Sequence, residues 1–213
     1  MGNADKILKI LKREYPEVKT ALHFGDVWQL LVAVILSAQC TDERVNKVTP
    51  ELFKKLPKVE DFVKVKPETL EQLIYSTGFY MAKAKNIKGA AEKILKEFGG
   101  KVPGEMEDLL KLPGVARKTA NVVLNAGFGK TEGMAVDTHV IRLSGRLGLA
   151  DGKLVKVKNA VKIERELMKK LPKMEWGNFS HLLIFHGRKV CFARKPNCKK
   201  CKLNKICPSA FKI

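Results

Sequence analysis

The segment 27–38 constrains the fold more than any other part of the sequence, because its residues are apolar almost all the way round a helix. A helix without a polar face has to be covered by other elements on every side. Apolar residues recur at helical spacing in nearly every other segment, and the alternation typical of strands is nearly absent. The sequence therefore predicts an all-α chain of about ten short helices joined by short loops.

Turn and capping residues mark the breaks between the expected helices. Thr41 and Asp42 form a capping signal, and Pro113 with Gly114 is a typical turn pair. Besides the segment above, we expect helices over 7–15, 45–53, 67–75, 82–98, 105–111, 115–127, 138–147, 154–170 and 177–187.

The length and the apolar runs of the chain limit the classes of protein to be considered. With 213 residues, the chain can form one sizeable domain or two small ones. Its longest apolar run, 30–36, is far shorter than the roughly 18–20 residues that cross a bilayer. The first residues, MGNADKILKI, lack the apolar core of a signal peptide. We therefore expect no membrane association and a cytoplasmic, nucleoid-associated location.

The net charge of the chain points to a polyanionic partner. Lysine and arginine number 41 against 22 aspartates and glutamates, which gives a formal net charge of +19. An excess of this size favours binding to nucleic acid. Proteins from hot environments are also rich in lysine, but their glutamate content rises with it, and the charges here are not balanced.

Four of the five cysteines fall in the last 23 residues, as Cys191, Cys198, Cys201 and Cys207. Without a signal peptide a disulfide framework is disfavoured, and the thiolates suit a soft metal or an iron–sulfur cluster. Zinc sites usually offer two close pairs of ligands, whereas C-x6-C-x2-C-x5-C has one close pair and two longer arms. The spacing predicts a metal centre and leaves its type open. Cys40 stands apart, and we expect it to be a buried thiol.

A tight turn at Pro113 and Gly114 separates the apolar segment that ends at Leu112 from the helix expected after it. The free N–H groups and the dipole at the start of that helix make a ready anion site. Arg117 and Lys118 fall in its first turn. The segment is either a helix–hairpin–helix that holds a DNA phosphate or a plain helical hairpin with two solvated cations.

Asp137, in the stretch AVDTHVIR, stands directly before an expected helix. Aspartate is a preferred N-cap residue, and that structural role alone explains its position. A carboxylate fixed by its own helix start is also well oriented for acid–base chemistry. Both interpretations are open from the residues, since capping and catalysis do not exclude each other.

Taken together, these motifs resemble the endonuclease III family, the bifunctional DNA glycosylase/AP lyases of the helix–hairpin–helix glycosylase superfamily. The resemblance rests on LPGVARKTANVV, on AVDTHVIR, and on HGRKVC with its cysteine spacing. LSAQCTD at 36–42 and STGFYMAKAKNI at 76–87 also match in order and spacing. The match therefore covers nearly the whole chain.

The resemblance implies a role for individual residues. Lys118 matches the lysine that attacks the sugar, and Asp137 matches the aspartate that assists it. The four C-terminal cysteines match the ligands of a [4Fe–4S] cluster. Gln39 matches the residue that enters the DNA near the space left by a flipped base. Thr77 and Phe79 match loop positions that wedge into the duplex.

The resemblance also places DNA contacts on the hairpin and on the basic C-terminal loop. We expect them at Gly114, Ala116, Arg117, Arg188 and Lys189. The family hairpin usually has glycine at the position of Ala116. We expect this position to be helical already, in which case alanine is harmless.

The implied organisation is two helical domains that flank a DNA-binding cleft. A six-helix domain would span 20–130, with the hairpin at about 105–127, and an iron–sulfur cluster domain would combine 1–19 with 131–213. The implied activity is removal of damaged bases, oxidised pyrimidines among them, from double-stranded DNA by a monomer. It would proceed through a lysine Schiff base at C1′ and β-elimination 3′ to the abasic site. The alternatives are a monofunctional glycosylase of the same superfamily, which would lack the lysine, and a DNA-binding module with a structural zinc.

Overall fold

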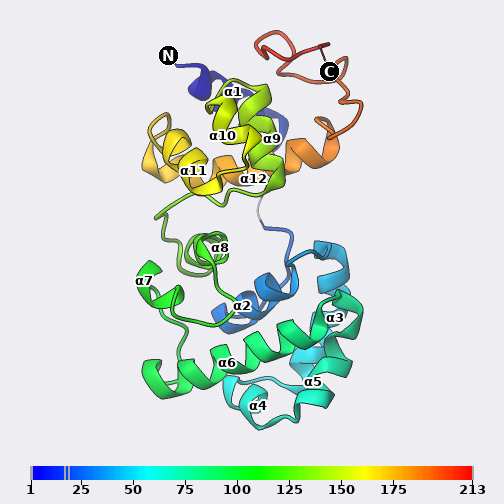
Figure 1. The fold of residues 1–213 in the computed structure, drawn as a ribbon, viewed down its shortest axis with the longest axis vertical. Helices are drawn as coiled ribbons and strands as arrows, with labels where there is room; N and C mark the ends of the chain where they lie inside the picture. The colour runs from blue at the N-terminus through cyan, green and yellow to red at the C-terminus, as the bar shows by residue number, and fades with distance from the viewer. Residues whose placement is uncertain (1, 17, 19, 213) are drawn as a thin grey trace. The chain divides into compact units, whose positions relative to one another are not determined.

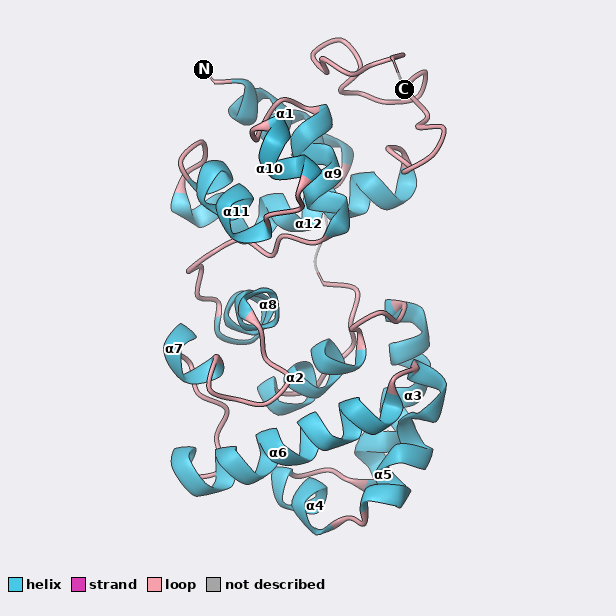
Figure 2. Cartoon of the chain, in the orientation of Figure 1, coloured by secondary structure: helices cyan, strands magenta, loops and turns pink. Residues whose placement is uncertain are grey.

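The computed structural model describes residues 2–16, 18 and 20–212. Over these residues the chain consists of helices and loops, without a strand (Figures 1 and 2). The all-α prediction is thereby confirmed. The chain divides into two compact units, Ala21–Lys130, and Met1–Thr20 together with Thr131–Ile213. None of the helices in the described part is long and apolar enough to cross a membrane.

The unit Ala21–Lys130 is built around one buried helix, α2 (Val27–Leu36). The other elements of this unit are α3 (Asp42–Lys55), α4 (Val59–Lys64), α5 (Pro67–Ile74), η1 (Tyr75–Thr77), α6 (Tyr80–Phe98), α7 (Met106–Leu109) and α8 (Arg117–Phe128). The segment from Leu30 to Leu36 is buried throughout, and α3, α6 and α8 pack against α2. The Asp26 carboxylate begins the helix by accepting from the Gln29 N–H at 2.8 Å. The segment 27–38 therefore has the surroundings that its apolar character requires.

The long helix α6 supports the rest of this unit, since α2, α4 and α5 all pack against it (Figure 1). Its Lys88 Nζ donates to the carbonyl oxygens of Phe62, Val63 and Val65 at 3.1, 2.8 and 2.7 Å, where α4 ends. These bonds satisfy carbonyls that a helix end leaves without partners in the helix. We did not expect α4, because six residues are too few for apolar spacing to reveal a helix.

The second unit has its own core. Its helices are α1 (Asn3–Glu14), α9 (Thr138–Arg146), α10 (Gly152–Lys156), α11 (Ala160–Met168), η2 (Lys173–Glu175) and α12 (Trp176–Lys189). Helix α12 packs against both α9 and α1, so the N-terminal helix is held by the C-terminal half of the chain. From 190 to 212 the chain forms turns without a helix, drawn orange to red in Figure 1.

The single helix predicted over 154–170 is wrong, because the structure has α10 and α11 there with a break between them. Lys158 has φ of 54°, which takes the backbone out of the helical path. Asn159 then caps α11, and its side-chain oxygen accepts from the Lys162 N–H at 3.0 Å. Asparagine favours caps over helix interiors, and apolar spacing alone does not register this preference.

The hairpin consists of α7, a turn and α8. Ala116 is the N-cap of α8 with φ of −90° and ψ of 170°, so the prediction that it is already helical is wrong. Its φ is nevertheless negative, and no glycine is needed there. The left-handed residue of the turn is Gly114, with φ of 77°. A Cβ atom at Gly114 would lie 2.8 Å from the Cβ of Asn86 in α6. The turn therefore depends on this one glycine.

Replacing Gly114 with alanine should destabilise the protein more than the same change at Gly129. Both residues have positive φ, 77° and 65°, but a Cβ at Gly129 meets nothing within 4 Å. The left-handed conformation costs alanine about 1–2 kcal/mol. We expect urea unfolding to show a loss of about that size for Gly129→Ala and a clearly larger one for Gly114→Ala. Equal losses would mean that Asn86 moves aside at no cost.

Candidate functional site

The start of α8 combines backbone donors with two cations. The N–H groups of its first turn have no acceptors within the helix. Arg117 is half-buried there, whereas the Lys118 side chain is exposed and accessible to a ligand. The turn before them is closed by the Val115 N–H, which donates to the Leu112 carbonyl at 3.1 Å. This arrangement suits a phosphate group, with an amine beside it.

Two loops of the same unit carry exposed residues in a left-handed backbone. Gln39, after α2, has φ of 52°, and Phe79, directly before α6, has φ of 48°. Such a conformation costs a non-glycine residue about 1 kcal/mol or more, and it is concentrated at functional sites. The Phe79 side chain is 66% exposed, and Tyr75 and Met81 near it are also exposed. The loop at Phe79 thus presents an apolar surface to solvent.

Thr77 lies in the same loop but points inward. It is only 2% exposed, and its Oγ1 donates to the Ile74 carbonyl at 2.8 Å. The side chain is therefore occupied in holding the loop, and we revise its expected role from a wedge to a support for Phe79.

The Asp137 carboxylate caps α9, which confirms one of the two interpretations drawn from the sequence. Its Oδ1 accepts from the N–H groups of His139 and Val140, both at 2.8 Å. Both bonds fall on the same oxygen, so the cap does not occupy Oδ2. The half-buried side chain is oriented by the backbone of its own helix.

Behind Asp137, a short polar cluster joins α9 to α12. Arg142 Nη2 lies 3.1 Å from His139 Nδ1 and donates to the carbonyls of Gly187 at 3.1 Å and Cys191 at 3.0 Å. Burial lowers the pKa of His139, and the Asp137 carboxylate opposes the shift. A Cβ atom at Gly187 would approach His139 Nδ1 to 2.9 Å. The glycine therefore allows the close approach of the two helices.

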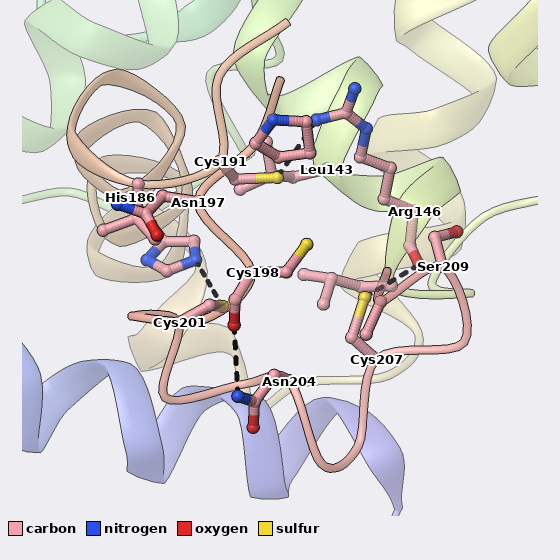
Figure 3. Close-up of a pocket in the computed structure, with 14 residues that line it drawn as sticks. Leu143, Arg146, His186, Cys191, Asn197, Cys198, Cys201, Asn204, Cys207 and Ser209 are labelled. Carbon is pink, nitrogen blue, oxygen red and sulfur yellow. Dashed lines mark hydrogen bonds between the residues drawn. The ribbon is translucent and has the colours of Figure 1, made fainter. Parts of the chain in front are cut away.

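The four C-terminal cysteines line one pocket, between α9, the end of α12 and the loop that follows (Figure 3). The pocket holds about 410 Å³ of space not filled by atoms, part of it open to solvent. Leu143, Leu147 and Val190 supply apolar wall. The structure thus brings together, around one pocket, four cysteines that lie up to 16 residues apart in the sequence.

Two polar groups approach the sulfur atoms. Arg146 Nη1 donates to Cys191 Sγ at 3.3 Å, and His186 Nε2 lies 3.4 Å from Cys201 Sγ (Figure 3). The Tyr15 hydroxyl lies 2.9 Å from His186 Nδ1. Burial raises the pKa of Tyr15 to about 12 and lowers that of His186 to about 4. A hydroxyl that donates to Nδ1 places the imidazole proton on Nε2, towards the sulfur.

The donor set of this pocket suits a soft, cationic centre. Burial raises the pKa of Cys201 and Cys207, and the neighbouring cysteines add to the shift. A bound cationic centre would offset this repulsion. In the described part of the chain, three or more His, Cys, Asp or Glu side chains are not arranged around the position of a single ion. A single zinc ion would need its thiolates at about 2.3 Å from one point. Four cysteine side chains that line one pocket could hold either a soft metal ion or an iron–sulfur cluster.

The loop around this pocket is strongly basic and open to solvent. Every lysine and arginine between 188 and 205 is exposed, namely Arg188, Lys189, Arg194, Lys195, Lys199, Lys200, Lys202 and Lys205. Lys189 Nζ also lies 5.8 Å from the centre of the Phe185 ring. This surface suits a polyanion.

Several residues that shape these sites were not predicted, Lys83, Arg142 and Arg146 among them. Each of them donates to at least one backbone carbonyl of a distant segment; Arg146 Nη1, for example, donates to the Phe192 carbonyl at 2.6 Å. No spacing in the sequence reveals such bonds. Of the predicted residues, Gln39, Phe79 and Lys118 belong to the unit Ala21–Lys130, whereas Asp137, Arg188, Lys189 and the four cysteines belong to the other unit.

Comparison with known proteins places this arrangement in a family. A family model described as "HhH-GPD superfamily base excision DNA repair protein" matches residues 32–173. The chain is 56% identical over 207 residues to an endonuclease III of Synechocystis sp., covering 97% of this chain and 92% of that protein. It is 45% identical over 193 residues to the endonuclease III of Bacillus subtilis, covering 91% and 86% of the two chains.

Two solved structures of similar proteins contain DNA. One is a non-covalent endonuclease III–DNA complex, with a TM-score of 0.91, 41% identity, and coverage of 100% of this chain and 98% of that one. The other is a trapped endonuclease III–DNA covalent intermediate, with a TM-score of 0.92, 41% identity, and coverage of 100% and 99%.

The cap at Asp137 can be tested apart from any activity. Asparagine also has a side-chain oxygen that can accept the bonds from His139 and Val140, whereas alanine has none. We expect Asp137→Asn to change the free energy of urea unfolding by only a few tenths of a kcal/mol, and Asp137→Ala to lower it by about 1–2 kcal/mol. Equal stability of the two variants would show that the cap contributes little.

Proposed function

This chain belongs to the endonuclease III family of HhH-GPD base excision DNA repair proteins, and on that premise we propose that it is a DNA glycosylase with AP lyase activity. The proposed substrate is double-stranded DNA with a damaged base, in particular an oxidised pyrimidine, or with an abasic site. Both units would contribute positive charge to phosphate binding.

One observation supports the lyase activity above the others. An exposed lysine, Lys118, stands in the first turn of the hairpin helix. The chain that carries it is 41% identical, over its whole length, to a protein solved as a covalent intermediate with DNA. A monofunctional glycosylase or a simple DNA-binding module needs no such nucleophile.

The proposed chemistry begins at Lys118. Its amine, once neutral, attacks C1′ of the sugar, and the bond from C1′ to the base breaks as the base leaves with its electron pair. Opening of the sugar ring gives a Schiff base, which makes the C2′ hydrogen acidic. Loss of that proton expels the 3′ phosphate oxygen and cuts the strand by β-elimination. The first-turn N–H groups of α8, with Gly114, Ala116 and Arg117, would hold the backbone phosphate meanwhile.

Asp137 would assist this reaction as a carboxylate. The cap holds Oδ1, so Oδ2 is the oxygen that could accept a proton or face the positive charge that develops on the sugar. Because the cap already fixes the side chain relative to α9, less conformational freedom would be lost when the carboxylate acts.

The loops at Gln39 and Phe79 would open the duplex. A base can be reached only when its nucleotide is flipped out of the stack. Phe79 has the exposed apolar ring needed to enter between bases, and Gln39 can form hydrogen bonds with the base left unpaired. Thr77, through its bond to the Ile74 carbonyl, would support the Phe79 loop.

The cysteine pocket would hold a [4Fe–4S] cluster through Cys191, Cys198, Cys201 and Cys207. When bound, the cluster would cross-link the loop and neutralise part of the thiolate charge. Arg146 and His186 would donate hydrogen bonds to two of the sulfur atoms. Arg188 and Lys189, held beside this loop, would then contact DNA phosphates.

Lys118→Gln should abolish the covalent adduct that borohydride traps with abasic duplex DNA, because the amide cannot form a Schiff base. The matched control is Lys96→Gln, which removes one exposed charge from a different helix, α6. We expect the control to trap at the wild-type level. An adduct that persists in Lys118→Gln, or its absence in the wild type, would contradict the lyase assignment.

The proposed cluster predicts the colour and metal content of the protein. Purified without oxygen, it should be yellow-brown and contain iron and acid-labile sulfide in equal amounts. Cys198→Ser should lose most of both. A colourless protein with stoichiometric zinc would support the alternative of a structural zinc site.

A further inference from the structure

Lys83 is a buried cation whose bonds join two separate loops. It lies in the first turn of α6 and is only 4% exposed. Its Nζ donates to the Leu36 carbonyl at 2.7 Å and to the Thr77 carbonyl at 2.8 Å. Burial lowers the pKa of Lys83, and the nearby Cys40 opposes the shift. A buried ammonium persists only where its partners compensate for lost hydration.

The two carbonyls stand at the bases of the loops that carry the strained, exposed residues. Leu36 is the last residue of α2, directly before the loop of Gln39. Thr77 ends η1, directly before Gly78 and Phe79. The other bonds within each loop are local: the hydroxyls of Ser37 and Thr77 donate to carbonyls three residues earlier. The Lys83 ammonium is thus shared between the loops.

Lys83 also fixes Phe79 directly. Its backbone N–H donates to the Phe79 carbonyl at 3.0 Å, the first bond of α6. The same residue therefore holds the left-handed Phe79 through its backbone and the neighbouring Gln39 loop through its side chain.

We propose that Lys83 is a positioning residue that ties the Gln39 and Phe79 loops into one preformed wedge for opening the DNA duplex. The inference rests on the proposed function for its substrate. Without the ammonium, each loop would have to be ordered separately when DNA binds, and both buried carbonyls would lose their partner. Loss of the Lys83 ammonium should therefore impair the opening of the duplex and leave the reaction at Lys118 unchanged.

A plain structural role is the competing explanation, and the chain contains its control. Lys88, on the same helix, donates its Nζ to three carbonyls where α4 ends. It joins neither candidate DNA loop. Lys88→Met therefore removes a lysine that caps carbonyls but has no bond to the wedge loops. Lys83→Met removes a lysine that caps carbonyls of both wedge loops.

The test compares Lys83→Met and Lys88→Met on two substrates. The first is a duplex with a non-cleavable abasic analogue opposite 2-aminopurine, whose fluorescence rises when the unpaired base is unstacked. Base removal from a damaged duplex is measured in the same series under single-turnover conditions. The second substrate is a single-stranded abasic oligonucleotide, trapped with borohydride, which has no duplex to open.

Lys83→Met should show a reduced fluorescence rise at saturating protein and a rate of base removal lower by about 10- to 100-fold, with trapping on single strands unchanged. Lys88→Met should match the wild type in all three. Equal behaviour of the two variants, or loss of single-strand trapping in Lys83→Met, would overturn the proposal. If the wild type itself traps nothing, the proposed function fails, and the fluorescence comparison still decides the role of Lys83.

A double-mutant cycle settles the case in which Lys83→Met does not fold. If the two loops act as one wedge, Gln39→Ala and Phe79→Ala in the otherwise wild-type chain should each remove much of the same step. The fold-loss in the rate of base removal should then be at least about fivefold smaller for the double variant than the product of the two single fold-losses. A double loss equal to that product would mean that the loops act independently, and the proposal would be wrong.

Discussion

The burial of α2 is the constraint on which the unit Ala21–Lys130 depends. A helix with apolar residues on all sides needs neighbours on all sides, and α3, α6 and α8 provide them. This packing decides where the hairpin cations and the Gln39 loop can lie. The start of α8 carries Lys118, and the end of α2 leads into Gln39. The candidate functional residues of this unit are therefore located by a hydrophobic requirement that is independent of their own chemistry.

The second unit solves a different problem, because its last segment has no helix and few buried residues of its own. Residues 190–212 are held by outside partners: Arg142 and Arg146 of α9 bind carbonyls at 191–193, and His186 of α12 reaches a sulfur. Without these partners, a segment so rich in lysine would bury too little apolar surface to adopt an ordered structure. Its shape depends on the hydrogen bonds from these arginine side chains, to which the proposed metal centre would add further links.

The fold class, the cap at Asp137 and the gathering of the four cysteines could be predicted from the sequence because their signals are local, whereas the roles proposed for Lys118, Gln39 and Phe79 came only from the family resemblance. Apolar spacing predicted the helices, and an aspartate before a helix predicted the cap at Asp137. The spacing of the cysteines predicted that the C-terminal loop gathers them at one site. The errors have local causes as well: Lys158 and Asn159 interrupt a helix that apolar spacing made continuous, and Ala116 lies one residue before its helix. What could not be predicted are bonds between distant segments. Lys83 looks like any other lysine until Leu36 and Thr77 are seen on either side of its ammonium.

Helix α9 is only 9 residues long, yet both of its ends form hydrogen bonds with candidate functional segments. Its first N–H groups donate to the Asp137 carboxylate, and its arginines donate to carbonyls at the start of the cysteine loop. The helix therefore connects a carboxylate at its start with the cysteine loop at its end. Replacing either arginine would loosen the cysteine loop and leave the cap at the start of the helix intact, because the carboxylate is held by the N–H groups of His139 and Val140.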